Sequence, residues 1–284
     1  TNAVEEYDGT SWSAGTAIGT ARYRHNAAGA SSTAGMVFAG TVGEAGNELT
    51  TTEVWTFSTF VAGAWASGGN LTTGRTKLAS SGTQTAGIVY GGGPNSPSTA
   101  VVGNAETYDG SSWTEVADLN TDRFTLSGTP AGSQTAAFAI AGNSGSVVDN
   151  VESWNGTSWT ETTDINTARE KAASGGTTTS AIYFGGSSDA SESWNGSAWT
   201  EVSDLNTPGE EVSGFGESNS NALAVGESNI VNRTESWDGS SWTEIADLNT
   251  ARTQALAFGA NNTSGVAAVG YAPGSPPLTT NTEE

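Results

Sequence analysis

Short apolar segments recur along the chain, and each ends in glycine. Residues 36–40, 88–92 and 182–186 are examples. Runs this short that end in glycine are typical of buried β-strands. Between such runs lie pairs of aromatic segments separated by Asp-Gly or Asn-Gly, as in 106–115. Because Asp-Gly and Asn-Gly tolerate the positive φ of a tight hairpin, the pattern predicts many short strands joined by tight turns.

The aromatic segment is repeated through the chain. The sequence at 106–115 returns at 152–161, 192–201 and 235–244, with a weaker copy at 5–12 and a longer one at 53–65. The second Trp of each copy measures the period, and its positions are Trp12, Trp65, Trp113, Trp159, Trp199 and Trp242. A period of about 40 to 50 residues with four strand signals per unit is typical of propeller blades.

The order of the strands predicts how the ring closes. In each unit the first strand follows a repeated Arg, as at 77–80, and the second ends at the glycines. The third carries Glu and an aromatic residue, and the fourth carries the second Trp. The chain opens with third and fourth strands and closes with first and second strands around 254–270. Pairing of the two ends in one sheet would complete a sixth blade and remove the open edges.

The sequence therefore predicts an all-β fold, a six-bladed β-propeller. The propeller is expected over residues 1–271, followed by an acidic tail at 272–284 that contains three prolines. The copy at 53–65 lacks Asp-Gly between its aromatic segments. We expect a longer loop at that turn.

A glycine pair, then Tyr or Trp, then Trp at a fixed distance, then Arg resembles the kelch repeat over almost the whole chain. Several units keep only one glycine of the pair. The exact residues at 152–161, followed by Asp-x-Asn-Thr-Ala-Arg, form a more specific motif. It is similar to the kelch-like repeats in virion structural proteins of marine tailed phages, cyanophages among them.

That resemblance implies a place on the surface of a virus particle, in a fibre, a spike or a surface decoration. Other virion proteins would then be partners. Because phage fibres are often trimers, the resemblance also implies a homo-oligomer.

Two other functions remain open, an adhesion domain of a bacterial surface or secreted protein and a propeller-type carbohydrate-active enzyme. The stretch 109–113 resembles the Asp-box of sialidases, but its Asp and Gly are adjacent, so the register differs. Galactose oxidase is a kelch propeller that uses copper, a crosslinked Cys and two His. This chain has no Cys, and His25 is its only His. The sequence favours a protein that is not an enzyme and that needs no cofactor.

Trp and Arg recur in nearly every unit, which is usual for architectural residues. We expect the Trp to fill the space between neighbouring blades. The Arg is expected to bind backbone carbonyls or the Glu of the third strand. The fifth unit has Gly209 in place of Arg. The predicted inter-blade residues are Trp12, Trp65, Trp113, Trp159, Trp199, Trp242, Arg22, Arg75, Arg123, Arg169 and Arg252.

Acidic residues also repeat, two and five residues after the second Trp. If they ringed one face, their oxygens would suit Ca²⁺. No stretch resembles a compact oxygen cage, so the favoured interpretation is that Asp caps a turn and Glu is solvated, and no metal site is predicted. The residues are Glu115, Glu161, Glu201, Glu244, Asp118, Asp164, Asp204 and Asp247.

The net charge is strongly negative, with 30 acidic against 9 basic residues and a formal value of -21. Such a field repels phosphate backbones and anionic lipid surfaces, so nucleic-acid binding is disfavoured. Membrane insertion is not expected, because no apolar run approaches the roughly 18 residues that a spanning helix needs. The absence of Cys excludes disulfides and thiolate chemistry.

The connections between second and third strands vary most in length. They are long at 41–52 and 93–105 and short at 187–191. In an up-and-down blade they share one face with the connections between blades, and we call it the loop face. Variable loops on a rigid frame favour recognition, here of a glycan or a protein, although passive spacers are the alternative. The candidates are Glu44, Asn47, Glu48, Asn95, Asn104, Asn143, Asp149, Asp189, Asn229 and Arg233.

Overall fold

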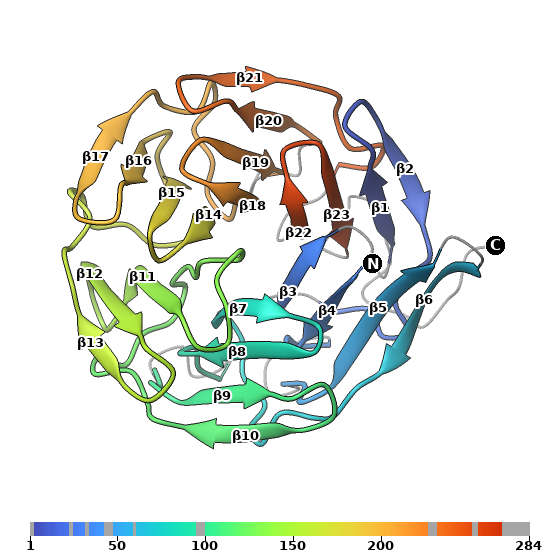
Figure 1. Cartoon of the computed structure of the whole chain (residues 1–284), viewed down its shortest axis with the longest axis horizontal. Coiled ribbons are helices and arrows are strands. Elements are labelled where there is room, and N and C mark those ends of the chain that lie inside the picture. Colours follow the sequence, from blue (N-terminus) through green and yellow to red (C-terminus); the bar gives the residue numbers. More distant parts are fainter. Residues whose placement is uncertain are drawn as a thin grey trace.

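The computed structural model describes residues 3–22, 25–31, 34–42, 48–58, 61–94, 100–226, 232–251 and 255–268. In this part of the chain six antiparallel sheets stand in a ring around a common centre (Figure 1). The predicted six-bladed β-propeller is confirmed. Among the described residues there is no helix long and apolar enough to cross a membrane. The predicted tail lies outside the described residues.

Five sheets are built from consecutive strands, ordered from the centre outward. The first contains β3 (Asn26–Ser31), β4 (Ala34–Phe38), β5 (Thr52–Ser58) and β6 (Val61–Ser67). The second contains β7 (Ala79–Thr83), β8 (Ala86–Tyr90), β9 (Ala105–Tyr108) and β10 (Trp113–Val116). The third contains β11 (Ala137–Asn143), β12 (Val147–Trp154) and β13 (Trp159–Glu161). The fourth contains β14 (Ala172–Thr177), β15 (Ser180–Gly185), β16 (Ser191–Trp194) and β17 (Trp199–Val202). The fifth contains β18 (Ser213–Ser218), β19 (Asn221–Val225), β20 (Thr234–Trp237) and β21 (Trp242–Glu244).

The sixth sheet joins the two ends of the chain. Its strands are β22 (Leu256–Asn261), β23 (Ser264–Ala268), β1 (Val4–Tyr7) and β2 (Trp12–Gly15). Val4 pairs with Ala268 and Tyr7 pairs with Gly265. The predicted closure by third and fourth strands from the start and first and second strands from the end is confirmed.

The hairpin between the third and fourth strands is held by a side chain. In the second blade Tyr108 pairs with Trp113, so four residues form the turn. Asp109 Oδ1 accepts hydrogen bonds from the backbone N–H of Ser111 and Ser112 at 2.9 and 2.8 Å. Gly110 has φ +94°, which glycine adopts without a Cβ clash. The Asp-Gly signal thus fixes the register of the outer hairpin.

Two local predictions were wrong. The longer loop expected in the copy at 53–65 is absent. Instead β5 and β6 of the first blade are longer, and Ser58 pairs with Val61. The third sheet has only three strands, and its inner segment makes an isolated bridge from Ser127 to Ile140. Pro130 interrupts that segment, because proline has no N–H to donate to a ladder.

The core lies between the blades. The described residues form six hydrophobic clusters, and each draws side chains from two neighbouring sheets. One cluster, for example, combines Phe38 of β4 with Val89 of β8 and Trp113 of β10. The stability of the ring is therefore mainly a sum of neighbour contacts, as in other repeat proteins.

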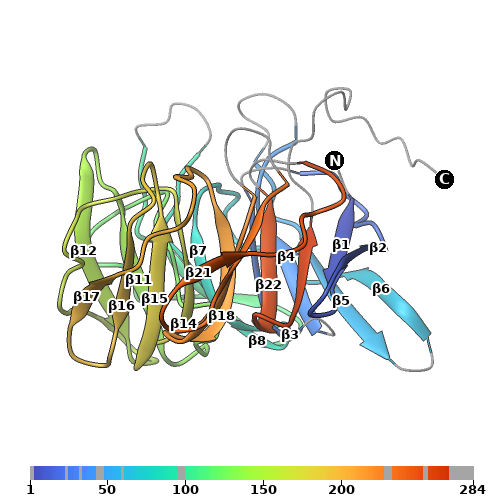
Figure 2. The same ribbon diagram turned by 90° about the horizontal axis from the view of Figure 1, so that it is seen from above.

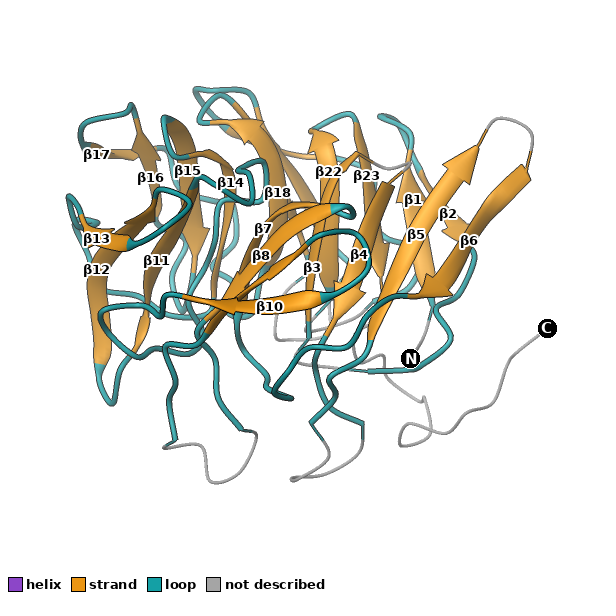
Figure 3. Cartoon of the chain, turned by 60° about the horizontal axis from the view of Figure 1, so that its bottom comes forward, coloured by secondary structure: helices purple, strands orange, loops and turns teal. Residues whose placement is uncertain are grey.

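The strands run through the thickness of the ring, so the connections lie on two opposite faces (Figures 2 and 3). The β5–β6 hairpin ends on one side and the β11–β12 connection on the other. On the loop face the two kinds of connection touch, as shown by the bridges from Thr76 to Gly93 and from Phe124 to Asn143. The loop face is thus built from both sets of connections.

Candidate functional site

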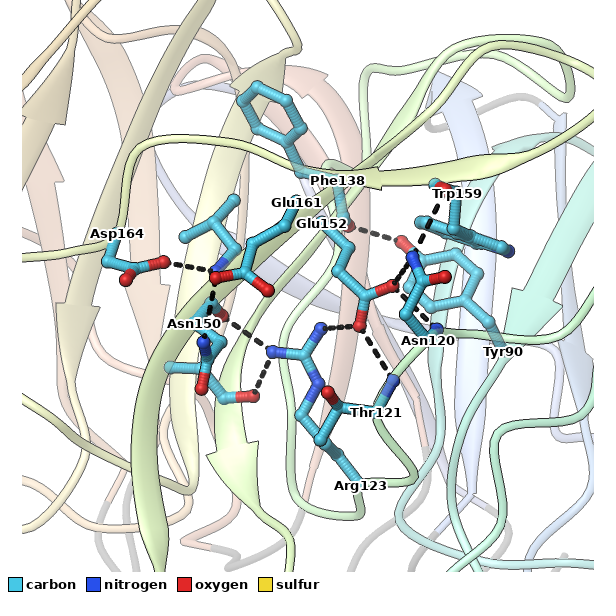
Figure 4. A network of polar contacts seen from close by, with 12 residues as sticks. Tyr90, Asn120, Thr121, Arg123, Phe138, Asn150, Glu152, Trp159, Glu161 and Asp164 are labelled. Atoms are coloured by element: carbon cyan, nitrogen blue, oxygen red, sulfur yellow. Dashed lines mark hydrogen bonds and ion pairs between the residues drawn. The ribbon is translucent and has the colours of Figure 1, made fainter.

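Each repeated Arg that the structure describes is buried against a Glu of a third strand. In the third blade Arg123 Nη2 donates to Glu152 Oε1 at 2.8 Å (Figure 4). Arg123 Nη1 donates to the carbonyls of Asn150 and Ala141 at 2.6 and 3.3 Å. Both charged side chains are 1 % exposed or less. The guanidinium therefore ties the incoming connection to two strand ends.

The same carboxylate also caps the preceding connection. Glu152 Oε2 accepts from the backbone N and from Nδ2 of Asn120, at 2.7 and 2.8 Å. Asn120 Nδ2 also donates to the carbonyl of Trp159 at 3.1 Å (Figure 4). Thr121 N donates to Glu152 Oε1 at 3.2 Å. Both oxygens of this carboxylate therefore accept hydrogen bonds from the protein.

The arrangement recurs in neighbouring blades. Burial lowers the pKa of Arg75 and of Arg123, and the facing carboxylate opposes that shift. Buried pairs of this kind are costly to break, because one charge is left without a partner. The other ion pairs are Arg22–Glu53 at 2.8 Å, Arg75–Glu106 at 2.7 Å and Arg169–Glu192 at 2.7 Å.

The repeated Trp residues reach across to the preceding blade. Trp113 Nε1 donates to Thr52 Oγ1 of β5 at 3.1 Å, and its ring lies 5.5 Å from that of Phe38. Trp12 is buried in the cluster with Phe215 of the fifth blade. The side chain of Trp65 and the whole of Arg252 lie outside the described residues. Further Nε1 donors are Trp159 to Ala117 O at 3.1 Å, Trp199 to Thr163 O at 3.2 Å and Trp242 to Ser191 Oγ at 3.1 Å.

The junction at Gly209 lacks the guanidinium. Glu235 Oε2 still accepts from the backbone N and Nδ2 of Asn206, at 2.9 and 2.7 Å. A small cavity of about 20 Å³ remains there, and Thr207, Arg233 and Glu235 are among its lining residues. Arg233 and Glu235 thus line the same small cavity beside the position that Arg holds at the other junctions.

The structure spreads the described loop-face candidates over five blades. Each is half-buried, and the main chain of several is engaged, since Asp149 O and Asp189 O accept from Ile165 N and Leu205 N. The central cavity described below contains none of them. The described members are Glu48, Asn104, Asn143, Asp149, Asp189 and Arg233, whereas Glu44, Asn47, Asn95 and Asn229 lie outside the described residues.

Three of the repeated Asp residues cap the start of a third strand. Asp118, Asp164 and Asp204 accept through Oδ1 from the backbone N of Ala105, Val151 and Ser191, at 3.3, 3.1 and 3.3 Å. Within the described part of the chain, no three His, Cys, Asp or Glu side chains are grouped as a metal site needs.

A cavity of about 320 Å³ lies where the innermost segments of all six blades meet. Its lining includes His25, Lys77, Lys171 and Glu211, which come from four different blades. These residues lie just before the first strands, so the cavity lies at the loop-face end of the channel. Lys77 also explains why β7 begins only at Ala79, since its φ of +57° departs from strand geometry.

In the described part of the chain, four consecutive blades contribute strained backbone to the mouth of this cavity. Lys77, Thr125, Lys171 and Glu211 all have positive φ, between 52° and 59°, which non-glycine residues seldom adopt. Thr125 N donates to Lys77 O at 2.9 Å, and Lys171 N donates to Thr125 O at 3.0 Å. Glu211 N donates to Lys171 O at 3.1 Å. Consecutive blades are therefore linked at the centre, and their side chains are held on a stiff frame.

The cavity wall below the ring carries serine hydroxyls. Ser80 Oγ donates to the carbonyl of Ala27 at 2.6 Å, and Ser174 Oγ donates to the carbonyl of Gly128. These bonds run between neighbouring blades. The serine protons are thus occupied, and Ser174 Oγ also lies 2.9 Å from Ser127 Oγ. A hydroxyl oxygen that donates its proton can still accept hydrogen bonds.

This cavity was not predicted from the sequence, in which His25 was noted only as the single histidine. The signal that could have revealed it is a shared position in the repeat. Lys77 and Lys171 each stand two residues after the repeated Arg, and Glu211 stands two residues after Gly209. Residues at one repeat position meet at the centre of a ring, whatever their separation in the sequence.

Comparisons with known proteins support the fold. The solved structure of YjhT is 12% identical to this chain, with a TM-score of 0.69 over 89% of this chain and 92% of that one. At this identity the likeness concerns the fold alone, and 227 solved chains match, so the fold does not single out an activity. No family model and no curated protein matches the chain.

Proposed function

We propose that this chain is a non-catalytic component of a virus particle, a propeller in a fibre, spike or surface decoration. Its loop face binds a glycan or a protein partner, in a virion where other structural proteins hold it. One observation carries the binding role: the repeated charged and aromatic residues join the blades, whereas sequence variation falls on the connections of one face. A rigid frame with variable loops is the usual arrangement for recognition.

The β11–β12 connection supports the use of this face. β12 begins at Val147, which is 42% exposed and is the one large hydrophobic side chain exposed among the described residues. Gly145, with φ +110°, forms the tip, and its N–H is held by Asn143 Oδ1 at 2.9 Å. A protruding apolar side chain on a preformed turn suits contact with a partner.

The assignment to a virion is supported by the amino-acid sequence of the repeat, which is similar to kelch-like repeats of marine tailed-phage structural proteins. A homo-oligomer follows from the same likeness. Neither a cofactor nor a metal belongs to the proposal. The buried carboxylates are occupied by Arg, Asn and backbone donors, which supports a role other than catalysis.

Attachment is tested with labelled protein on host cells. Within the two long connections, 41–52 and 93–105, residues 43–47 and 95–99 are replaced by Gly/Ser segments of equal length. Thr52, Gly93 and Asn104, which bond neighbouring connections and strands, are kept. We expect cell binding to fall at least tenfold, while far-UV circular dichroism and melting stay unchanged. The matched control is Ala198→Ser, which lies in an outer hairpin turn on the opposite face. Unchanged binding by the loop variant would refute recognition by these loops.

The particle assignment is tested by cryo-electron microscopy of intact virions. The proposal expects six-bladed density on capsid or tail with the loop face outward. If that face is buried against another virion protein, the propeller is a connector. If the chain copurifies with bacterial surface material and never with particles, it is an adhesion domain, and release of sugar from a glycan panel would identify an enzyme.

A further inference from the structure

Both lysines of the chain line the central cavity. The chain carries 30 acidic and only 9 basic residues, and four of its arginines are buried in ion pairs at the blade junctions. Lys77 and Lys171 are the only two lysines in the sequence, and His25, its single histidine, lines the same cavity. In a protein with a net charge of -21, this cavity therefore gathers both lysines and the single histidine of the chain.

The backbones of Lys77 and Lys171 lie on either side of one residue at the cavity mouth. Lys77 and Lys171 flank Thr125 in the chain of backbone hydrogen bonds at the cavity mouth. Lys171 Nζ lies 3.2 Å from Glu210 Oε2, and both side chains remain partly exposed. Lys77 Nζ lies 5.0 Å from the centre of the Phe124 ring. These contacts orient the lysines without burying their charges.

We propose that the central cavity binds a small molecule that carries one oxyanion group, a carboxylate, phosphate or sulfate. Lys77 and Lys171 supply the charge-assisted donors. Ser80 and Ser174, whose protons are committed to neighbouring blades, offer acceptor oxygens to the rest of the ligand. The stiff ring holds the donors in place before binding, which lowers the entropy lost on association.

The charges restrict the ligand further. Glu211 is the one acidic residue among the described lining residues, so it opposes a second negative charge. The field of the whole chain repels polyanions at long range, although salt screens it beyond about 8 to 10 Å. A ligand with one oxyanion group that fits a cavity of about 320 Å³ is therefore compatible with Glu211 and with the negative field of the chain. The inference goes beyond the proposed function, because it concerns the channel and holds wherever the protein resides.

Two lysines make the test site-specific. Reductive ¹³C-methylation of the full chain labels Lys77 and Lys171 together with the terminal amine, whose signal is distinguished by its pH dependence. Sulfate, phosphate and acetate are titrated separately at constant ionic strength. We expect saturable shifts of both lysine signals with at least one anion. Comparison of the three anions distinguishes a carboxylate from a phosphate or sulfate ligand.

Variants then assign the affinity to the cavity. By calorimetry, Lys77→Gln and Lys171→Gln are each expected to weaken binding about tenfold, the effect of losing one charged hydrogen bond. Glu211→Gln is expected to strengthen it. Ala198→Glu, in the exposed turn of the opposite face, lowers the net charge by the same one unit and is expected to leave affinity unchanged.

The proposal is overturned if wild type shows no saturable shift with any of the three anions, a result that needs no variant to fold. It is also overturned if both lysine variants bind like wild type, or if Ala198→Glu weakens binding as much as they do. Loop replacement leaves the cavity intact. Failure of cell attachment and failure of anion binding are therefore distinguishable.

Discussion

Two blade junctions of this ring differ by one side chain. At the junction of the third blade, Arg123 and Asn120 both bind Glu152. At the junction of the fifth blade the Arg position is Gly209, and Glu235 keeps the pair of hydrogen bonds from Asn206. The cap made by Glu and Asn is therefore the constant part of the joint, and the guanidinium is an addition to it.

The main chain around the missing Arg is also retained. Gly186 N donates to Gly209 O at 3.0 Å, as Gly142 N donates to Arg169 O at 3.0 Å in the preceding repeat. A side chain has been lost without loss of the backbone contact that positions the next blade. The comparison teaches that the path of the chain is set by backbone bonds and by the carboxylate, whereas Arg mainly secures two carbonyls.

The largest expected effect comes from removing the carboxylate at each junction. Glu152→Ala leaves the buried Arg123 without its partner and is expected to cost about 3–5 kcal/mol in the free energy of unfolding. Glu235→Ala removes a cap of neutral donors and is expected to cost about 1–3 kcal/mol. Urea denaturation followed by Trp fluorescence measures both. Equal costs would contradict the distinction drawn between the two junctions.

A second effect comes from converting one junction into the other. Gly209→Arg with Arg233→Asn recreates the Arg123 and Asn150 pattern beside Glu235. We expect each single change to destabilise, and the double variant to recover about 1–2 kcal/mol relative to their sum, because the arginine side chain introduced at position 209 and Arg233 would compete for the same small cavity. Urea denaturation of wild type, the two single variants and the double variant closes the cycle. Additive changes would show that the two side chains do not compete for this cavity.

The smallest expected effect concerns the outer turns of the two blades. Asp238 accepts from Ser240 N and Ser241 N at 2.8 and 2.9 Å, while Asn155 makes the equivalent bonds at 3.0 Å. Hydrogen bonds to Ser240 lower the pKa of Asp238. Its stabilisation is therefore complete above its unfolded pKa near 4 and is lost as pH falls through the lower folded pKa.

Asp238→Asn removes this acid sensitivity. We expect the variant to melt slightly below wild type at neutral pH, and the gap to close as pH falls toward about 3. Melting curves across this range provide the measurement. A gap that widens in acid would have the wrong sign for a depressed pKa.

Much of the fold was predictable because the same strand pattern occurs in six copies along the sequence. The spacing of the Trp residues located the blades, and the order of segments at the two ends predicted the shared blade in which Val4 pairs with Ala268. Single departures were harder. Pro130 removed a strand, and the insertion before Trp65 lengthened a hairpin, because local backbone chemistry overrides the period at those places.

The central cavity was not predictable from any one segment. Lys77 and Lys171 are far apart in the sequence, and they share only their position two residues after the repeated Arg. They line one cavity because a ring brings equivalent positions to one axis, and nothing in the local pattern shows which position faces that axis. The positive φ that holds them there is likewise invisible, since Lys, Thr and Glu carry no glycine-like signal for it.

The closing blade has a mechanical consequence. Val4, at the start of β1, is paired with Ala268, at the end of β23, so the chain enters and leaves the ring at adjacent residues. Tension applied through both ends would load the pairs singly, from Val4–Ala268 to Tyr7–Gly265, and peel the strands apart. Tension applied through only one end of the chain does not load the β1–β23 pairing. The propeller is therefore suited to attachment through one end, and its closing blade would open under low force if both ends were pulled apart.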